Sequence, residues 1–226
     1  PFIVFPDADP VHAAKGAAAL KFLNAGQACI SPNRLYVPNS LRSEFEETLC
    51  TRVSKLQTGN GMEDGIGVGP LVNDAAVSKV EQQVEDAREK GAGVPVGGAR
   101  LTEGEHASGH FFAPTVLTDV RPEMTIYREE TFGPVAPVIG YDDPEQVLEL
   151  ANDTNYGLAA YVYTRDISVA MRAFEALRFG IIGINDVNPT SASVPFGGMG
   201  DSGVGREGGH EGISEYLETK TGGFAI

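Results

Sequence analysis

The chain has 226 residues and a formal net charge of −14, from 17 basic and 31 acidic side chains. This charge argues against nucleic acid as a partner, because the phosphates would be repelled. No apolar run approaches the roughly 20 residues that a membrane-spanning helix needs, so no membrane partner is expected, and no signal peptide pattern is present. Two cysteines are too few for a disulfide framework, which favours a reducing, cytoplasmic setting.

Short apolar runs alternate with amphipathic stretches nearly throughout the chain. In chain order the predicted elements are a strand at 2–5, a helix at 10–24, a strand at 33–37, a helix from Ser40 to about 56, a glycine-rich loop at 59–69, a helix at 73–90, a strand at 94–96, an exposed connection or hairpin at 97–112, strands at 115–117 and 135–139, a helix at 143–152, a strand at 158–164, a helix from 166 to about 180, a strand at 181–184, a glycine-rich loop at 195–212 and a short helix at 211–217.

This order of elements predicts the fold class and the position of a site. Strand–helix–strand units at this spacing indicate an α/β fold with a doubly wound, mostly parallel sheet. In such sheets ligands bind beyond the carboxyl ends of the strands, so we expect the site at that edge. The chain opens on proline and runs directly into a strand, which leads us to expect a piece of a longer protein.

Cys29 is the first candidate functional residue. It lies in the run Asn24-Ala-Gly-Gln-Ala-Cys-Ile-Ser31, between a predicted helix and a predicted strand. A thiol on a glycine-bearing connection is well placed to attack a substrate, whereas a thiol on a helix face is a small apolar filler. Cys50 falls into the second category, because it lies beside the apolar face of its helix. Cys29 is therefore the candidate nucleophile.

The run Glu129-Glu130-Thr131-Phe132-Gly133-Pro134 places two carboxylates and an aromatic ring directly before a buried strand. Two interpretations stay open on chemistry alone. A carboxylate here can accept two hydrogen bonds from a ribose diol, with Phe132 as an apolar wall. Alternatively, the run is only the charged start of a strand.

Other motifs are weaker. Two Gly-x-Gly-x-x-Gly matches fall within 198–208, but they do not follow a strand directly and do not open a long helix. A sharply turning loop is therefore favoured over a dinucleotide fingerprint. His106 and His110 are four residues apart, yet Ser108 and Gly109 between them argue against a helix, and no third ligand is nearby. No metal site is expected.

Three motifs in register resemble the aldehyde dehydrogenase superfamily. They are Gly26-Gln27-Ala28-Cys29, Glu129–Pro134, and Pro195-Phe196-Gly197-Gly198 followed by Ser202–Glu207. The resemblance covers the whole chain, and the tail Glu215–Lys220 looks closest to succinate-semialdehyde dehydrogenases. It implies a catalytic domain at 1–215 and a C-terminal oligomerisation arm at 216–226. It also implies that the N-terminal nucleotide-binding domain is absent from this chain.

The resemblance also implies roles for five residues. By position, Cys29 matches the nucleophile that attacks the aldehyde, and its backbone N–H matches half of the oxyanion hole. Glu130 matches the residue that holds the nicotinamide ribose, with Phe132 beside it, so NAD or NADP is the expected cofactor. Phe196 matches a substrate-pocket residue. Glu207 matches a glutamate that relays protons, although holding the glycine loop is an equal alternative. The expected partners are a small aldehyde and further copies of the chain.

The sequence departs from the resembled pattern at several places. The activating glutamate and the asparagine that completes the oxyanion hole would lie upstream of Pro1, so this chain alone is expected to be inactive. In the succinate-semialdehyde branch, an arginine that contacts the substrate stands where this chain has Leu23, and a redox cysteine stands where it has Ser31. Two other functions remain open: a thiol hydrolase acting through Cys29, and a truncated, non-catalytic interaction module.

Overall fold

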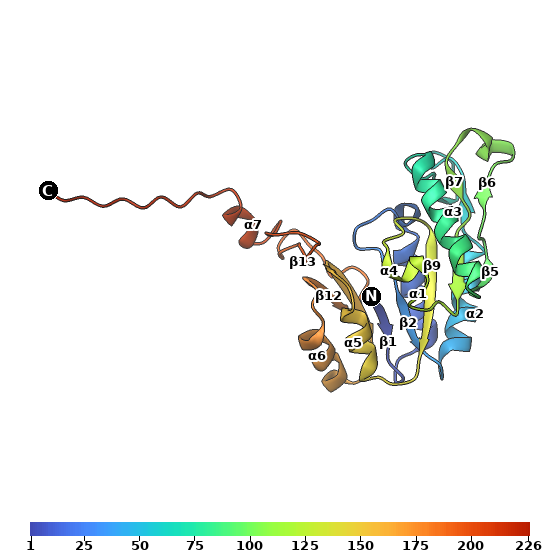
Figure 1. The fold of residues 1–226 in the computed structure, drawn as a ribbon, viewed down its shortest axis with the longest axis horizontal. Helices are drawn as coiled ribbons and strands as arrows, with labels where there is room; N and C mark the ends of the chain where they lie inside the picture. Colours follow the sequence, from blue (N-terminus) through green and yellow to red (C-terminus); the bar gives the residue numbers. More distant parts are fainter.

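Seven strands form one sheet in the order β12-β11-β1-β2-β9-β8-β5 in a computed structural model, which describes all 226 residues (Figure 1). The elements are β1 (Phe2–Val4), α1 (Pro10–Lys21), the 3-10 helix η1 (Leu23–Gly26), β2 (Leu35–Pro38), α2 (Arg42–Val53), β3 (Gln57–Thr58), β4 (Ile66–Val68), α3 (Asp74–Glu89), β5 (Gly93–Val96), β6 (Arg100–Leu101), the 3-10 helix η2 (Gly104–Ser108), β7 (Phe111–Phe112), β8 (Thr115–Thr118), α4 (Thr125–Arg128), β9 (Val135–Tyr141), α5 (Gln146–Asn152), β10 (Tyr156–Gly157), β11 (Ala159–Tyr163), α6 (Ile167–Ala176), β12 (Ile181–Ile184), β13 (Met199–Gly200) and α7 (Glu211–Ser214).

The sheet confirms the predicted fold class. Six of its strands run parallel, and only β5 pairs antiparallel, with β8. Helix α2 packs against α1, and both belong to connections that lead away from β1 and β2. On the other face, the Tyr36 hydroxyl of β2 lies 2.9 Å from that of Tyr127 in α4 and donates to the Leu150 carbonyl of α5. Helices therefore cover both faces of the sheet, as a doubly wound fold requires.

The core surrounds the inner strand β1, whose three residues Phe2, Ile3 and Val4 are fully buried. Beyond its carboxyl end, the Asp7 carboxylate accepts hydrogen bonds from Thr164 Oγ1 and from the backbone N–H groups of Arg165 and Asp166. Partial burial by itself would raise the pKa of Asp7, but the hydrogen bonds together outweigh it and lower the pKa below its usual value. The carboxyl edge of the sheet is thus closed by internal hydrogen bonds at this point.

Several predicted boundaries were wrong for local reasons. Ser40 does not cap α2, because the chain turns through Leu41 before the helix begins. Helix α5 begins at Gln146, three residues later than predicted, because the Asp143 carboxylate accepts from the Glu145 N–H in a preceding turn. The glycine-rich loop at 59–69 includes β4, which pairs with β3. The predicted hairpin within 97–112 is confirmed by the antiparallel pair β6–β7.

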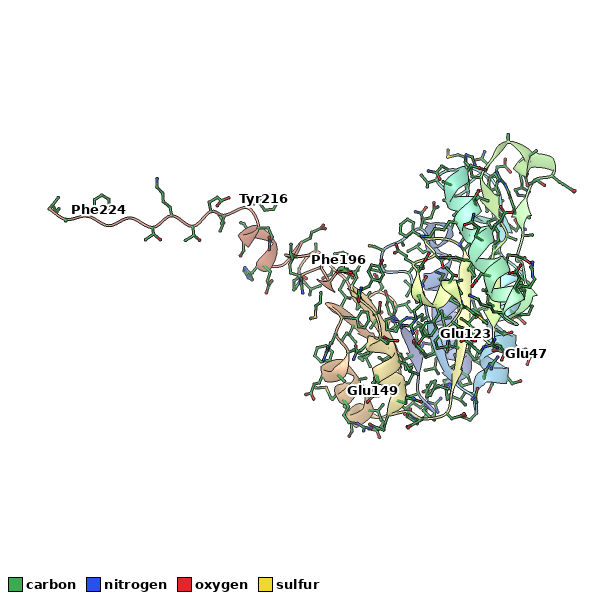
Figure 2. All side chains as sticks on the ribbon, viewed as in Figure 1. Glu47, Glu123, Glu149, Phe196, Tyr216 and Phe224 are labelled. Carbon is green, nitrogen blue, oxygen red and sulfur yellow. The ribbon has the colours of Figure 1, made fainter.

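The C-terminal residues leave the body of the molecule. After α7 the chain continues to Ile226 without a further helix or strand and extends away from the sheet (Figure 1). Figure 2 shows Tyr216 and Phe224 along this extension, and both side chains are exposed. No helix of the structure combines the length and the apolar character needed to cross a membrane.

Candidate active site

The predicted site residues gather at the amino ends of the parallel strands, so the expectation of a site at the carboxyl ends was wrong. Cys29 precedes β2 and Glu130 precedes β9, and both line one cavity of about 270 Å³. We call it the strand-edge cavity. Its further lining includes residues that enter β1, β11 and β12: Pro1, Leu158, Ala159 and Phe179. The connections that enter the strands, rather than those that leave them, therefore build the site.

Cys29 sits in an exposed turn in which the Ser31 N–H donates to the Ala28 carbonyl at 2.9 Å. The buried Tyr161 of β11 donates from its hydroxyl to the Ile30 carbonyl at 2.9 Å, which ties the turn to the sheet. The backbone N–H of Cys29 donates to no group of the protein. It is therefore free to donate to an oxygen of a bound substrate.

Three consecutive residues before this turn, Asn24, Ala25 and Gly26, adopt left-handed backbone conformations, with φ of 49°, 58° and 75°. The Asn24 side chain donates to the Gln27 carbonyl at 3.0 Å, and Gln27 accepts from the Val72 N–H at 2.9 Å. This strained connection ends the helical pattern at Lys21, where the sequence predicted helix to residue 24. Its shape turns the following residues toward the amino edge.

Gly26 touches the second motif directly. A Cβ atom at Gly26 would overlap the carbonyl oxygen of Gly133, so only glycine permits this approach. The motifs Gly26–Cys29 and Glu129–Pro134 are about 100 residues apart in the sequence but are neighbours in the structure. Their contact places Cys29 and Glu130 on the same cavity.

Glu130 is exposed and forms no ion pair, whereas Phe132 lines neither cavity around Cys29 and is 40% exposed. Sequence reasoning missed two residues here. Asn33 holds the backbone on both sides of Glu130. The side chain of Lys21 is 1% exposed, and burial lowers its pKa from 10.5 to about 8, although the negative charge of Glu130 opposes this shift. A lone lysine at the end of a helix carried no signal in the sequence.

Phe196 and Glu207 lie together on the other side of Cys29. Their backbones pair, with the N–H of each donating to the carbonyl of the other at 2.7 Å. Both line a second cavity of about 890 Å³, the glycine-loop cavity, which Cys29 also lines. Figure 2 shows Phe196 where the chain leaves the body toward its extended end. The glycine-rich segment is mainly a loop, as the sequence predicted, and the structure adds that it lines a cavity shared with Cys29.

The structure contains no group of three His, Cys, Asp or Glu side chains arranged to hold a metal ion. His106 Nε2 lies 2.8 Å from the Thr58 carbonyl and packs against Phe111. The surroundings of Cys29 offer a thiol, a backbone N–H without an acceptor and nearby carboxylates that include Glu130 and Glu207, which are groups suited to nucleophilic catalysis.

Comparison with known proteins identifies the family. Residues 1–222 match the model described as the aldehyde dehydrogenase family. The chain belongs to the aldehyde dehydrogenase family. It is 49% identical over 220 residues to a succinate-semialdehyde dehydrogenase (NADP(+)) of Escherichia coli, which covers 97% of the chain and 45% of that relative. It is 46% identical to a glutarate-semialdehyde dehydrogenase of Pseudomonas putida, with the same coverage.

Solved structures agree with this membership. An NADP-dependent enzyme of E. coli superposes with a TM-score of 0.92 at 49% identity, covering 96% of the chain and 44% of that structure. A betaine aldehyde dehydrogenase of Staphylococcus aureus in complex with NAD+ gives a TM-score of 0.92 at 40% identity, covering 97% and 44%. The chain therefore spans a little less than half the length of the relatives it matches.

Gly26→Ala should destabilise this aldehyde dehydrogenase chain by about 2 kcal/mol or more, because the new Cβ meets the Gly133 carbonyl and φ is positive. Urea unfolding of the isolated chain measures the change. Gly61→Ala is the matched control, since nothing lies within 4 Å of a Cβ there, and it should stay within about 1 kcal/mol of the parent. Equal stability of the two variants would contradict the proposed contact.

Lys21→Met should change how stability depends on pH. The unfolded state binds the lysine proton up to pH 10.5 and the folded state only up to about pH 8, so the parent should gain stability as pH rises through this window. Below pH 8 the buried ammonium should cost about 3 kcal/mol. Urea unfolding between pH 7 and 10.5 should show Lys21→Met more stable at pH 7, with the difference shrinking as pH rises. A difference that stays constant across the window would contradict this.

Proposed function

We propose that the chain is the catalytic-domain part of an NAD(P)-dependent aldehyde dehydrogenase that oxidises an aldehyde to a carboxylic acid through Cys29. The observation that carries the proposal is the position of Cys29 between two cavities, one lined by Glu130 and the other by Phe196 and Glu207. A nucleophile in this reaction must meet the aldehyde and the cofactor together. Cys29 lines both cavities, so one cavity can receive the cofactor and the other the aldehyde.

In the proposed reaction the Cys29 sulfur attacks the carbonyl carbon of the aldehyde. The unpaired N–H of Cys29 donates a hydrogen bond to the oxygen as negative charge develops on it. The thioester that remains after oxidation is hydrolysed by water. Glu207, exposed on the rim of the glycine-loop cavity, is the group of this chain that can relay the protons of this step.

The residues of the strand-edge cavity fit a nicotinamide cofactor. The carboxylate of Glu130 has no ion-pair partner and opens toward the cavity that Cys29 shares, so it can accept hydrogen bonds from a ribose diol. Phe132 is 40% exposed but lies outside the lining of this cavity, so its proposed place beside the nicotinamide rests on the family resemblance alone. When bound, the cofactor supplies the acceptor for the hydride.

The substrate is proposed to be a small aldehyde that enters beside Phe196. Three of the similar relatives are named as succinate-, aspartate- and glutarate-semialdehyde dehydrogenases, which supports an aldehyde with a second polar group. Leu23 is 53% exposed and occupies the position at which the resemblance implies a substrate-contacting arginine in the succinate-semialdehyde branch. This chain therefore lacks that contact to a substrate carboxylate. The two free cysteines support a cytoplasmic location.

Cys29→Ser in the full-length parent protein should lower kcat for aldehyde oxidation by about three orders of magnitude or more, because the nucleophile is lost. Following the reduced cofactor at 340 nm with several semialdehydes measures this. Cys50→Ser is the control: its thiol lies on α2 away from both cavities, and the rate should stay near that of the parent.

Two outcomes would replace the proposal. Ester turnover without nicotinamide, combined with no aldehyde oxidation, would favour a thiol hydrolase. Absence of both activities, with Cys29 alkylated no faster than a free thiol, would favour a non-catalytic interaction module.

Residues 1–215 are proposed as the catalytic domain and 216–226 as an oligomerisation arm. The edge strand β12 pairs only with β11, and the extended tail has exposed side chains at Phe224 and Ile226, so each is a template for pairing with another copy. The chain should be a dimer or larger by light scattering, and truncation after Glu215 should yield monomers. A monomer mass that does not change with concentration, with the tail intact, would refute the arm's role.

A further inference from the structure

One side chain, Asn33, binds the backbone on both sides of Glu130. Its Nδ2 donates to the Glu129 carbonyl at 3.1 Å and to the Ile126 carbonyl at 3.2 Å. Its Oδ1 accepts from the Thr131 N–H at 3.0 Å. We propose that Asn33 is a positioning residue that fixes the Glu130 carboxylate relative to Cys29. This inference rests on the proposed function, because Glu130 is taken to hold the cofactor.

The Glu130 segment depends on Asn33 because it has few other bonds. Helix α4 has only four residues, so its carbonyls near the end need partners from outside the helix. Among the N–H groups of residues 130–133, only that of Thr131 donates a hydrogen bond, and Asn33 is its acceptor. Thr131 is 2% exposed, so water cannot easily replace that bond.

Glu130 itself has no anchor at its carboxylate. It forms no ion pair, and the buried cation of Lys21 acts on it only through its field. The region that the carboxylate can reach is therefore limited by the position of the Glu130 backbone, which Asn33 holds through Glu129 and Thr131. Since Asn33 follows Cys29 by four residues in the same connection, one segment carries the nucleophile and also orients the group proposed to hold the cofactor.

Only a side chain with both a donor and an acceptor can form these three hydrogen bonds to the backbone around Glu130. Aspartate keeps the acceptor for Thr131 but loses both donated bonds and adds a negative charge near Glu130. Alanine loses all three bonds. Serine keeps one donor and an acceptor on a shorter side chain, so Asn33→Ser is the milder variant if Asn33→Ala does not fold.

The test is a double-mutant cycle in the full-length parent protein, with Asn33→Ala, Glu130→Gln and the double variant. The readouts are the dissociation constant of reduced nicotinamide cofactor, by fluorescence titration, and the thermal midpoint. Asn185→Ala is the matched control, because the Asn185 side chain likewise accepts from the Thr164 N–H and donates to the Thr164 carbonyl, at the opposite edge of the sheet. Steady-state kcat and KM for the cofactor are measured on the same proteins.

Asn33→Ala should weaken cofactor binding about tenfold and raise KM more than it lowers kcat. In the Glu130→Gln background the same substitution should change binding less than about twofold, because its effect passes through Glu130. Asn185→Ala should lower the thermal midpoint and leave binding unchanged. An equal effect of Asn33→Ala in both backgrounds, or none in either, would overturn the proposal.

Failure of the proposed function is a separate result. If Glu130→Gln leaves cofactor binding unchanged, the role of Glu130 is wrong and the positioning role of Asn33 falls with it. If the parent oxidises no aldehyde but cofactor binding follows the cycle, the proposed reaction fails and Asn33 still positions Glu130.

Discussion

The close approach of two loops at the amino edge of the sheet is the constraint on which the site depends. Strands β2 and β9 are parallel neighbours, so the connections that enter them lie side by side. Gly26 lies against the Gly133 carbonyl, and a Cβ at Gly133 would itself lie 2.6 Å from Val80 of α3. Two glycines therefore let a helix and two loops come together at one point. Cys29 and Glu130 share a cavity because of that packing.

Two buried cations lie near the carboxyl ends of helices at this amino edge of the sheet. Helix α5 ends here, and the buried Arg34 donates to its carbonyls at Leu150 and Ala151, at 3.0 and 2.9 Å. Lys21, the last residue of α1, adds a second buried cation. Cations near helix carboxyl termini offset the negative end of the helix dipole. At the opposite edge the Asp7 carboxylate is held by hydrogen bonds from Thr164, Arg165 and Asp166.

Local signals in the sequence predicted most of the fold, whereas the site needed contacts between distant segments. Asp9, Asn73 and Asp166 cap their helices through hydrogen bonds to residues two or three positions on, which a short window of sequence contains. The sequence placed the site at the carboxyl ends of the strands, whereas the predicted site residues lie at the amino ends. Hydrophobic periodicity locates strands and helices, but it does not show which of the connecting loops carry the functional groups. Asn33 was missed for the same reason, since its partners lie more than 90 residues away.

The charges around Cys29 also bear on which aldehyde the site can accept. The arginines that line the two cavities are already engaged: Arg34 with helix carbonyls, Arg128 with Asp153 at 2.6 Å, and Arg206 with the carbonyls of Gly198 and Gly205. The carboxylates of the two cavities that have no ion-pair partner are those of Glu130, Asp201, Glu207 and Glu215. Arg34 and Arg206 bond only neutral groups and keep their positive charge, so a negative charge on the substrate would meet both cations and carboxylates here. The preference of the proposed site between anionic and neutral aldehydes therefore depends on how these two guanidinium groups and four carboxylates are arranged around the bound substrate.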